Sequence, residues 1–373
     1  MIYADNASTT RPSPAAKDAV IKCLERFGNP SSAHALGIDS ANLIKDARRR
    51  IKSIVNASDR DKLVFTSGGS ESNNHAFSIA KESGKRKLII SAIEHDSVFN
   101  TANELEKQGF TLTVLGVDKN GLISLEELER CIDSETAMVS VMTVNNEIGT
   151  VMPISEIGAI CRQNGVLFHT DAVQAVGNMH IDVAESNIDL MSFSAHKFGG
   201  LKGVGALYIR NGIKASPLLF GGMQENGLRA GTENTVGIAA MAAALEDVCF
   251  NLKEKQEYVK ALRNSLENRL LAISGTVHNN RFDRRINGIT NVSFPNINSN
   301  AMIMMLDEAG ICVSSGAACR TAEDAPSRVL AAIGCNDKIS SSAIRFSLTS
   351  ENTAFEVDII ANRVEDIVAR YKR

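Results

Sequence analysis

Short apolar runs alternate with helix-like segments between about residues 60 and 210. Several runs are rich in β-branched residues and predict strands, whereas the segments between most of them predict helices. The predicted strands are Leu63–Thr66, Lys87–Ser91, Thr111–Leu115, Met138–Thr143, Val166–Thr170, Leu190–Ser194 and Ala206–Ile209. The predicted helices are Asn42–Val55, Thr101–Gln108, Ser124–Cys131 and Ile154–Asn164. This alternation favours an α/β fold with a mostly parallel, seven-stranded sheet covered by helices.

The pattern changes after about residue 250. A long charged helix is predicted over Leu252–Ile273, with apolar residues spaced along one face. It is followed by strand Ile289–Phe294, helix Asn300–Ala309, strand Ile311–Ser314, helix Ser327–Ile333, strand Ile344–Leu348 and helix Thr353–Tyr371. This order is typical of a smaller α+β domain. We therefore predict a large domain over residues 13–250, and a small domain over residues 251–373 that includes the N-terminal segment 1–12.

Charge and hydropathy narrow the class of protein. The chain of 373 residues has 40 Lys and Arg against 43 Asp and Glu, which gives a formal net charge of −3. This balance argues against direct binding to nucleic acid, which usually needs a basic excess. The longest apolar stretch, Val236–Leu245, is too short to span a membrane. The N-terminus lacks the basic region of a secretory signal.

The chain has seven cysteines, an odd number without C-x-x-C spacing, so we expect free thiols in a reducing cytoplasm. Six lie on or beside predicted elements and are interpreted as packing residues: Cys23, Cys131, Cys161, Cys249, Cys312 and Cys335. Cys319 differs, because it lies in the run Ser314–Pro326 of small and polar residues, which is typical of an exposed loop. An exposed thiol without a partner is a candidate nucleophile. No spacing of His and Cys matches a metal site.

Three polar features follow predicted strands, where open α/β sheets bind their ligands. The Gly-rich turn Ser67–Asn74 opens a helix and is either an ordinary loop or an anion site formed by backbone N–H groups. Asp171 follows the strand Val166–Thr170 and is either a helix cap or the partner of a cationic ring nitrogen. Lys197 follows the strand Leu190–Ser194 and is either a solvated charge or an amine that forms a Schiff base.

Together these features predict a cofactor site. Asp171 and Lys197 are about one strand–helix–strand unit apart, so we expect them on neighbouring strand ends. An anion cradle, an acid for a ring nitrogen and a Schiff-base lysine are the parts that a pyridoxal phosphate site requires. Their appearance in this order is much more specific than any one of them.

Ten ordered segments along almost the whole chain match one known family. They are Asp5–Thr10, Asn29–His34, Thr66–Asn74, Glu94–His95, Val144–Gly149, His169–Gln174, Ser192–Lys197, Gly221–Thr232, Ser314–Cys319 and Ile344–Leu348. In these segments the sequence resembles the cysteine desulfurases of the NifS/IscS type, which are class V aminotransferases within the fold-type-I pyridoxal phosphate enzymes. The resemblance implies a PLP-dependent transferase fold.

The resemblance also implies a role for each residue around the cofactor ring. Lys197 would hold the cofactor as a Schiff base and later move the substrate α-proton. Asp171 would pair with the pyridinium nitrogen, and Asn146 and Gln174 would hydrogen-bond on the side of the phenolate oxygen. His95 would stack on the ring face and shuttle protons; the alternative is a buried histidine satisfied by the backbone.

Further residues are implied for the phosphate and the substrate. The phosphate would be held by Gly69, Ser70, Ser194 and His196. Thr232 would reach a phosphate across a homodimer interface, so that a complete site needs two chains. Arg345 would clamp the substrate carboxylate bidentately, and the alternative is a structural ion pair.

The implied reaction converts L-cysteine to L-alanine. The thiolate of Cys319 would attack the substrate sulfur, keep it as a persulfide and pass it to an acceptor protein. Relatives serve iron–sulfur cluster assembly, tRNA thiolation and DNA phosphorothioation, and the sequence does not choose among these. Three departures from the family pattern are Gly199–Lys202, Met152 and Arg320. We hypothesise that Arg320 favours the thiolate of the neighbouring cysteine by its charge.

Two other readings stay open. A selenocysteine lyase or another class V enzyme would share this fold, although an aminotransferase needs no thiol such as Cys319. A catalytically silent scaffold that only docks partners is the alternative from a different class of protein. The presence of Lys197, Asp171, His95 and Cys319 argues against the scaffold.

Overall fold

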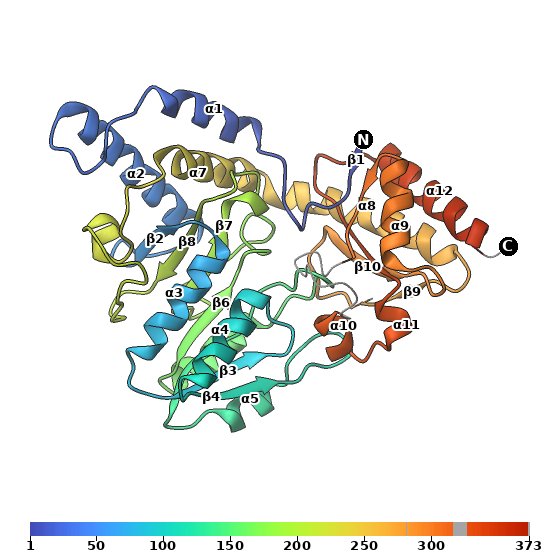
Figure 1. Cartoon of the computed structure of the whole chain (residues 1–373), viewed down its shortest axis with the longest axis horizontal. Helices are drawn as coiled ribbons and strands as arrows, with labels where there is room; N and C mark the ends of the chain where they lie inside the picture. Colours follow the sequence, from blue (N-terminus) through green and yellow to red (C-terminus); the bar gives the residue numbers. More distant parts are fainter. Residues whose placement is uncertain (281, 316–326, 372–373) are drawn as a thin grey trace.

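Seven strands form the central sheet of the computed structural model, which describes residues 1–280, 282–315 and 327–371 (Figure 1). They are β2 (Lys62–Thr66), β3 (Lys87–Ser91), β4 (Thr111–Leu115), β5 (Thr136–Ser140), β6 (Leu167–Asp171), β7 (Leu190–Ser194) and β8 (Gly205–Ile209). Their order across the sheet is β2-β8-β7-β6-β5-β3-β4. The β3–β4, β3–β5, β5–β6 and β6–β7 pairs are parallel, and β8 is antiparallel to β2 and β7. The predicted seven-stranded, mostly parallel sheet is confirmed.

The ends of β5 and β6 differ from the prediction in ways that have a structural reason. β5 ends at Ser140, whereas the apolar run predicted a strand up to Thr143. Beyond Ser140 the chain stays buried and still bonds to β6, through Val141 N to His169 O at 3.1 Å and Thr143 N to Asp171 O at 2.9 Å. The run is therefore apolar because it remains covered as it leaves the sheet. β6 ends at Asp171 itself, so this acid is a strand residue.

Helices cover both faces of the sheet, as predicted. Adjacent strand residues such as Val64 and Phe65 belong to different core clusters because side chains alternate across a pleated strand. The cluster of Val64 includes residues of α3 (Gly69–Lys81) and α4 (Asp96–Lys107). The cluster of Phe65 includes residues of α1 (Pro14–Leu24), α2 (Ala35–Ile54), α5 (Leu125–Cys131), α6 (Ile154–Gln163) and α7 (Thr235–Cys249).

The sequence pattern did not predict α1 and α7. α7 is Ala-rich, and most of its residues between Gly237 and Leu245 are buried, so it lacks the polar face of an amphipathic helix. It packs against α1 and α2. α1 begins after Ser13, whose hydroxyl accepts a hydrogen bond from Ala16 N at 3.1 Å, and Pro14 occupies its first turn.

The C-terminal part of the described chain contributes most residues of a second hydrophobic cluster, whereas its residues Ile289, Val329 and Leu330 belong to the cluster of Phe65. Its elements are α8 (Leu252–Ala272), β9 (Val277–His278), β10 (Ile289–Ser293), α9 (Ser299–Glu308), β11 (Ile311–Cys312), α10 (Arg328–Ala332), α11 (Asp337–Ser340), β12 (Ala343–Ser347) and α12 (Ala354–Tyr371). β12, β10 and β9 form an antiparallel sheet, and β11 pairs with β1 (Ile2–Tyr3). Ile2 and Ala4 pack in the same cluster as residues of α8, α9 and α12. This packing supports our proposal that segment 1–12 joins a small domain that begins near residue 251.

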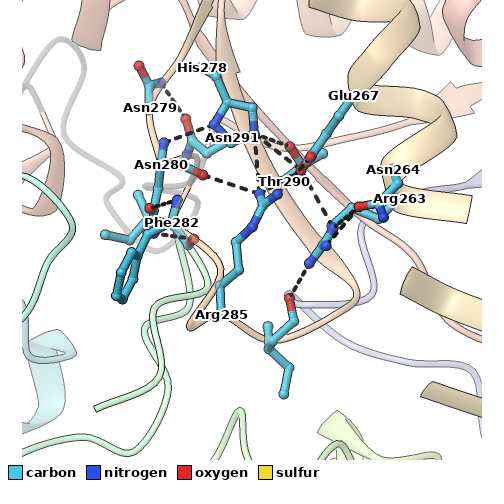
Figure 2. Close-up of polar contacts among 12 residues, drawn as sticks. Arg263, Asn264, Glu267, His278, Asn279, Asn280, Phe282, Arg285, Thr290 and Asn291 are labelled. Atoms are coloured by element: carbon cyan, nitrogen blue, oxygen red, sulfur yellow. Dashed lines mark hydrogen bonds and ion pairs between the residues drawn. The ribbon is translucent and has the colours of Figure 1, made fainter. Parts of the chain in front are cut away.

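A buried ionic cluster links α8 to the segment that follows β9 (Figure 2). Arg285 donates two hydrogen bonds to the carboxylate of Glu267, at 2.6 and 2.7 Å. His278 Nε2 lies 3.1 Å from the same carboxylate. Asn280 Nδ2 donates to Thr150 Oγ1 at 2.7 Å, so the segment after β9 also contacts the turn that follows β5. The cluster thereby connects the two hydrophobic parts of the molecule.

No single helix among the described residues is long and apolar enough to cross a membrane. α7 and α8 meet the combined requirements of length and hydropathy only as a pair, and the pair is bent by 73°. Since most of α7 is buried in the core, its apolar composition is explained by packing.

Candidate functional site

A cavity of about 350 Å³ lies where the carboxyl ends of β6 and β7 meet the N-terminus of α3. Ten of the residues predicted for the site line it: Gly69, Ser70, His95, Asn146, Asp171, Gln174, Ser194, His196, Lys197 and Arg345. The other lining residues are Ala7, Ser8, Asn73, Ser97, Met142, Val144 and Val173. A larger cavity of about 580 Å³ lies between the end of α2 and the start of α8, but it contains none of the predicted residues. We therefore place the site by its chemistry rather than by the size of the cavity.

Lys197 lies in a short 3₁₀ turn, η1 (Ala195–Lys197), directly after β7. Its Nζ donates hydrogen bonds to the backbone oxygens of Ala7 at 2.7 Å and Ser8 at 2.8 Å. The N-terminal segment therefore forms one wall of the cavity and holds the amine at its edge. A primary amine held in this way at a strand end has the geometry that a Schiff-base lysine requires.

Asp171 is a buried carboxylate with neutral hydrogen-bond donors. It is 4% exposed, its Oδ2 accepts from Asn73 Nδ2 at 2.8 Å, and its Oδ1 accepts from Val173 N at 3.0 Å. Within residues 1–280, 282–315 and 327–371, no Lys, Arg or His forms an ion pair with it. A buried charge is costly without a counter-charge, so the position suits a cationic ring nitrogen. Asp171 pairs with Ser192 across β6 and β7, which confirms that Asp171 and Lys197 lie at neighbouring strand ends.

The N-terminus of α3 has the features expected of the predicted anion cradle. α3 begins at Gly69, and the capping residue Gly68 offers no side chain to its first N–H groups. A Cβ atom on Gly69 would lie 2.7 Å from Val173 Cγ2, so the close approach of the two segments needs a glycine here. Free N–H groups and the positive end of the helix favour a phosphate. Ser70 and Ser194 add hydroxyl groups to the same cavity wall.

His196 completes this side of the cavity as a neutral imidazole. Burial lowers its pKa to about 4, and the charges of Lys197 and Lys202 act in the same direction. Its Nδ1 lies 3.1 Å from Thr9 Oγ1. At neutral pH the ring therefore contributes a hydrogen bond rather than a charge.

His95 caps the N-terminus of α4 with its own side chain. Its Nδ1 accepts a hydrogen bond from Ser97 N at 3.1 Å and lies 2.8 Å from Ser97 Oγ. Because Nδ1 is an acceptor here, the neutral ring carries its proton on Nε2. Asn73 Nδ2 donates to both Ser97 Oγ and Asp171 Oδ2, each at 2.8 Å. The side-chain amide of Asn73 therefore links Ser97, which binds the His95 ring, to the buried Asp171.

Arg345 lies on β12 and is 2% exposed. Its Nη1 donates to Asn146 O at 2.8 Å, and its Nη2 donates to Asp5 Oδ1 at 2.9 Å and Ser8 Oγ at 2.6 Å. The structural ion pair considered as the alternative for Arg345 is thus present, and the residue also lines the cavity. Gln174 Nε2 donates to Ala7 O at 2.8 Å. The N-terminal segment is therefore held by residues from both parts of the molecule.

One predicted residue that the structure describes, Thr232, does not line the cavity. Thr232 is exposed, on the segment between η2 (Gln224–Gly227) and α7. Cys319, together with Arg320, lies outside the described residues. Among the other cysteines, burial raises the pKa of Cys161 to about 12 and that of Cys249 to about 11, which makes both poor nucleophiles.

Asn73 and Ser97 are site residues that the sequence alone did not assign. Asn73 falls inside the quoted motif Thr66–Asn74, one turn after the anion cradle on α3. Ser97 lies two residues after His95, at a spacing that suits a turn around a helix cap. The place of these residues in or beside the family motifs indicated that they could belong to the site. Their hydrogen-bond partners, however, are known only once α3 and α4 pack together.

Comparison with known proteins identifies the family. A match to the family Aminotransferase class-V spans residues 2–360. The chain belongs to this family. The cysteine desulfurase IscS of Clostridium botulinum (strain Hall) is 41% identical over 374 residues, which cover 98% of this chain and 94% of the relative.

Two solved structures share the fold. A NifS-like protein superposes with a TM-score of 0.93 at 36% identity, over 99% of each chain. A structure described as SspA in complex with cysteine gives a TM-score of 0.84 at 34% identity, over 94% of this chain and 99% of the other. The predicted family and fold class are confirmed.

Class-V membership implies the use of pyridoxal phosphate, and the cavity fits this group. Asp171 offers a buried carboxylate that has no cationic partner among the described residues, the first turn of α3 offers uncapped N–H groups, and Lys197 offers an amine. These are the three chemical requirements of the cofactor, for the ring nitrogen, the phosphate and the aldehyde.

Proposed function

We propose that this protein is a pyridoxal phosphate-dependent cysteine desulfurase. It converts L-cysteine to L-alanine and transfers the sulfur, as a persulfide on Cys319, to an acceptor protein. The observation that carries the proposal is the convergence of Asp171, Lys197 and the uncapped start of α3 on one cavity. The likeness to IscS, and to a structure whose description includes bound cysteine, supports the reaction and the substrate.

The residues of the cavity divide the work of the reaction. Pyridoxal phosphate supplies an electron sink for the carbanion that forms at the substrate Cα. Asp171 would keep a proton on the ring nitrogen of the bound cofactor, and Lys197 would take and return the α-proton through Nζ. Arg345 orients the substrate carboxylate with its planar guanidinium. His95 presents its Nε2 proton to the cavity because Nδ1 is held by Ser97.

The sulfur transfer uses the thiolate of Cys319. The thiolate attacks the substrate sulfur, and an S–S bond forms while the Cβ–S bond of the substrate breaks. The electron pair of the broken bond stays with the substrate carbon, which takes up a proton and leaves as alanine. The products are alanine and a persulfide, so neither an oxidant nor a reductant is needed until the acceptor takes the sulfur.

A homodimer would complete the site. Thr232 is exposed, and the segment just before it exposes Leu219, Phe220 and Met223 by 42%, 86% and 80%. Exposed apolar side chains of this size are typical of interfaces. We infer that this segment packs against a second chain and brings Thr232 to the partner's phosphate cradle. A molar mass of a single chain in light scattering would contradict this inference.

The function is tested by replacing the nucleophile. The Cys319→Ala variant, incubated with L-cysteine and dithiothreitol, is expected to lose alanine and sulfide formation by about a hundredfold or more, because the sulfur has no acceptor. Cys335→Ala is the matched control: Cys335 is half-buried, its pKa is raised by burial, and its loss should leave the rate unchanged. Sulfide formation by Cys319→Ala at the wild-type rate would contradict the persulfide mechanism. If Cys319→Ala keeps its activity on selenocysteine, the lyase alternative is favoured.

A further inference from the structure

Arg328 contacts the segment that carries His95 from a distant part of the chain. It is the first residue of α10, and its Nη1 lies 3.0 Å from Asp96 Oδ1. Its Nη2 donates to the backbone oxygen of Glu94. The guanidinium carbon lies 4.0 Å from the centre of the Phe99 ring. One side chain thus binds the residues immediately before and after His95, and the next turn of α4 as well.

This set of contacts uses the whole shape of an arginine. The guanidinium is a planar fork that donates in two directions while its face lies on an aromatic ring. The side chains of Arg328 and Asp96 are 22% and 31% exposed, so their ion pair is partly shielded from solvent. A lysine would neutralise Asp96, but it has no flat face for Phe99 and no second donor in the plane of the first.

The orientation of the His95 ring depends on the backbone that Arg328 holds. The ring is bound through Nδ1 to Ser97 in the first turn of α4. Val98 N and Phe99 N donate to the backbone oxygen of His95, at 2.9 and 3.0 Å. A shift of this turn therefore moves the ring within the cavity. Arg328 itself does not line the cavity.

We propose that Arg328 is a positioning residue for His95. Its contacts to Glu94, Asp96 and Phe99 fix the first turn of α4, and through that turn they aim His95 Nε2 into the cavity. The proposal deepens the proposed function and rests on it, because it assigns His95 a part in the reaction.

The competing explanation is that Arg328 only anchors α10. The neighbouring residue Ser327 provides a matched control for it. Ser327 Oγ donates to Glu147 Oε2 at 2.5 Å and accepts from Leu330 N at 3.1 Å, so it both caps α10 and ties it to the turn that contains Glu147. The Ser327→Ala variant loosens α10 without removing any contact to the His95 segment.

A double-mutant cycle on the holoenzyme separates the two explanations. Arg328→Met is expected to lower kcat for alanine release by about tenfold to a hundredfold, while KM for cysteine changes less than about twofold. The variant with both Arg328→Met and His95→Gln should be no slower than His95→Gln alone, because Arg328 acts through that ring. Losses that multiply in the double variant would overturn the proposal.

Two further variants sharpen the cycle. Arg328→Lys keeps the positive charge but not the planar guanidinium, so its kcat should be close to that of Arg328→Met. A wild-type kcat in Arg328→Lys would show that only the charge matters and would overturn the proposal. Ser327→Ala combined with His95→Gln should show losses that multiply. If the losses of kcat caused by Ser327→Ala and His95→Gln also fail to multiply, the cycle does not report on positioning by Arg328, and the proposal is wrong.

Hydrogen exchange in the cofactor-free protein tests the positioning without any activity. The amides of Ser97, Val98 and Phe99 should exchange at least about threefold faster in Arg328→Met than in wild type, and at an unchanged rate in Ser327→Ala. Unchanged exchange in Arg328→Met would overturn the proposal. If wild type releases no alanine, the proposed function fails, while the exchange rates still decide whether Arg328 holds the His95 turn.

Discussion

Glu94, the residue before His95, is a buried carboxylic acid. Its side chain is 1% exposed, and its Oε1 accepts from Ser91 Oγ at 2.5 Å and from Met142 N at 2.9 Å. Burial raises its pKa to about 8, and the charge of Asp171 acts in the same direction. The group is therefore mainly protonated at neutral pH, and its ionisation opposes folding.

The Glu94→Gln variant tests this protonation state. Since the folded-state pKa lies above the usual value, the contribution of Glu94 to stability is complete below about pH 4.5 and is lost as the pH rises through about 8. Glutamine keeps the shape without the titration, so its stability relative to wild type should increase between pH 5 and pH 9. The upper bound is roughly 5 kcal/mol, at about 1.4 kcal/mol per pKa unit. Urea unfolding at both pH values measures it, and a constant difference would show that Glu94 does not titrate in this range.

At the scale of single residues, part of the candidate site could be predicted from the sequence. Asp171 and Lys197 could be placed together from the sequence because Asp171 lies at the end of one strand and Lys197 just beyond the end of the next, and strand ends of a parallel sheet meet at one edge. Asn73 could not be given a role, because its two acceptors come from α4 and β6. A polar residue inside a helix has many possible partners, and only packing selects one.

The turn from Val144 to Val151 shows how an element positions the site. Asn145 Oδ1 accepts from Glu147 N at 2.9 Å and Ile148 N at 3.0 Å, which fixes the backbone around Asn146. Gly149 closes the turn with a φ of +75°, a conformation that L-residues with a Cβ rarely adopt.

Gly149→Ala is expected to cost more than backbone strain alone. A Cβ at Gly149 would lie 3.2 Å from Ile289 Cβ and 3.4 Å from Ile286 Cγ2, in the packed contact with β10. Gly84 is the matched control, because it has a φ of +76° and nothing within 4 Å of the added atom. We expect Gly84→Ala to lose about 1 kcal/mol of unfolding free energy, and Gly149→Ala to lose a further 1–3 kcal/mol or so. Equal losses in urea unfolding would show that the contact with β10 yields without cost.

The pattern of apolar residues predicts some helices of this chain and misses others. The pattern predicted α8 within one residue of its observed end, because α8 has a charged face and an apolar one. It missed α7, which has hardly any polar face because it is covered by α1 and α2 as well as by the sheet. A helical period of apolar residues appears in a sequence when one face of the helix is exposed to water and the other is buried in the core. A helix that is buried on nearly all sides has no such period.

At the scale of the whole molecule, Glu267 on α8 anchors the segment that follows β9 (Figure 2). Its carboxylate binds Arg285 and His278, and Arg263 Nε lies 3.7 Å away. Hydrogen bonds from His278 and Arg285 lower the pKa of Glu267 to about 2, against the opposing effect of its burial. The segment after β9 is thereby fixed against the turn that contains Thr150.

Glu267→Gln is expected to destabilise the fold by about 3 kcal/mol or more, because it leaves buried cations without a counter-charge. The folded-state pKa is depressed, so this contribution is present above about pH 4.5 and is lost as the pH falls toward about 2. The deficit of the variant in urea unfolding should therefore shrink between pH 5 and pH 3. Glu246→Gln, which removes the exposed ion pair with Arg50, is the control and should cost at most about 1 kcal/mol. Equal effects of the two variants would show that the cluster does not stabilise the fold.

The sequence by itself determined the sheet, most of its helical cover and the class-V family, because strand runs, Gly-rich turns and ordered motifs are properties of neighbouring residues. Only the tertiary structure decided which distant groups meet. Arg345 reaches Ser8 and the backbone of Asn146, and Lys197 reaches Ala7. These contacts join segments that are far apart along the chain, and their geometry follows from how the core packs. Local periodicity encodes which face of an element is buried, whereas packing encodes what that face touches.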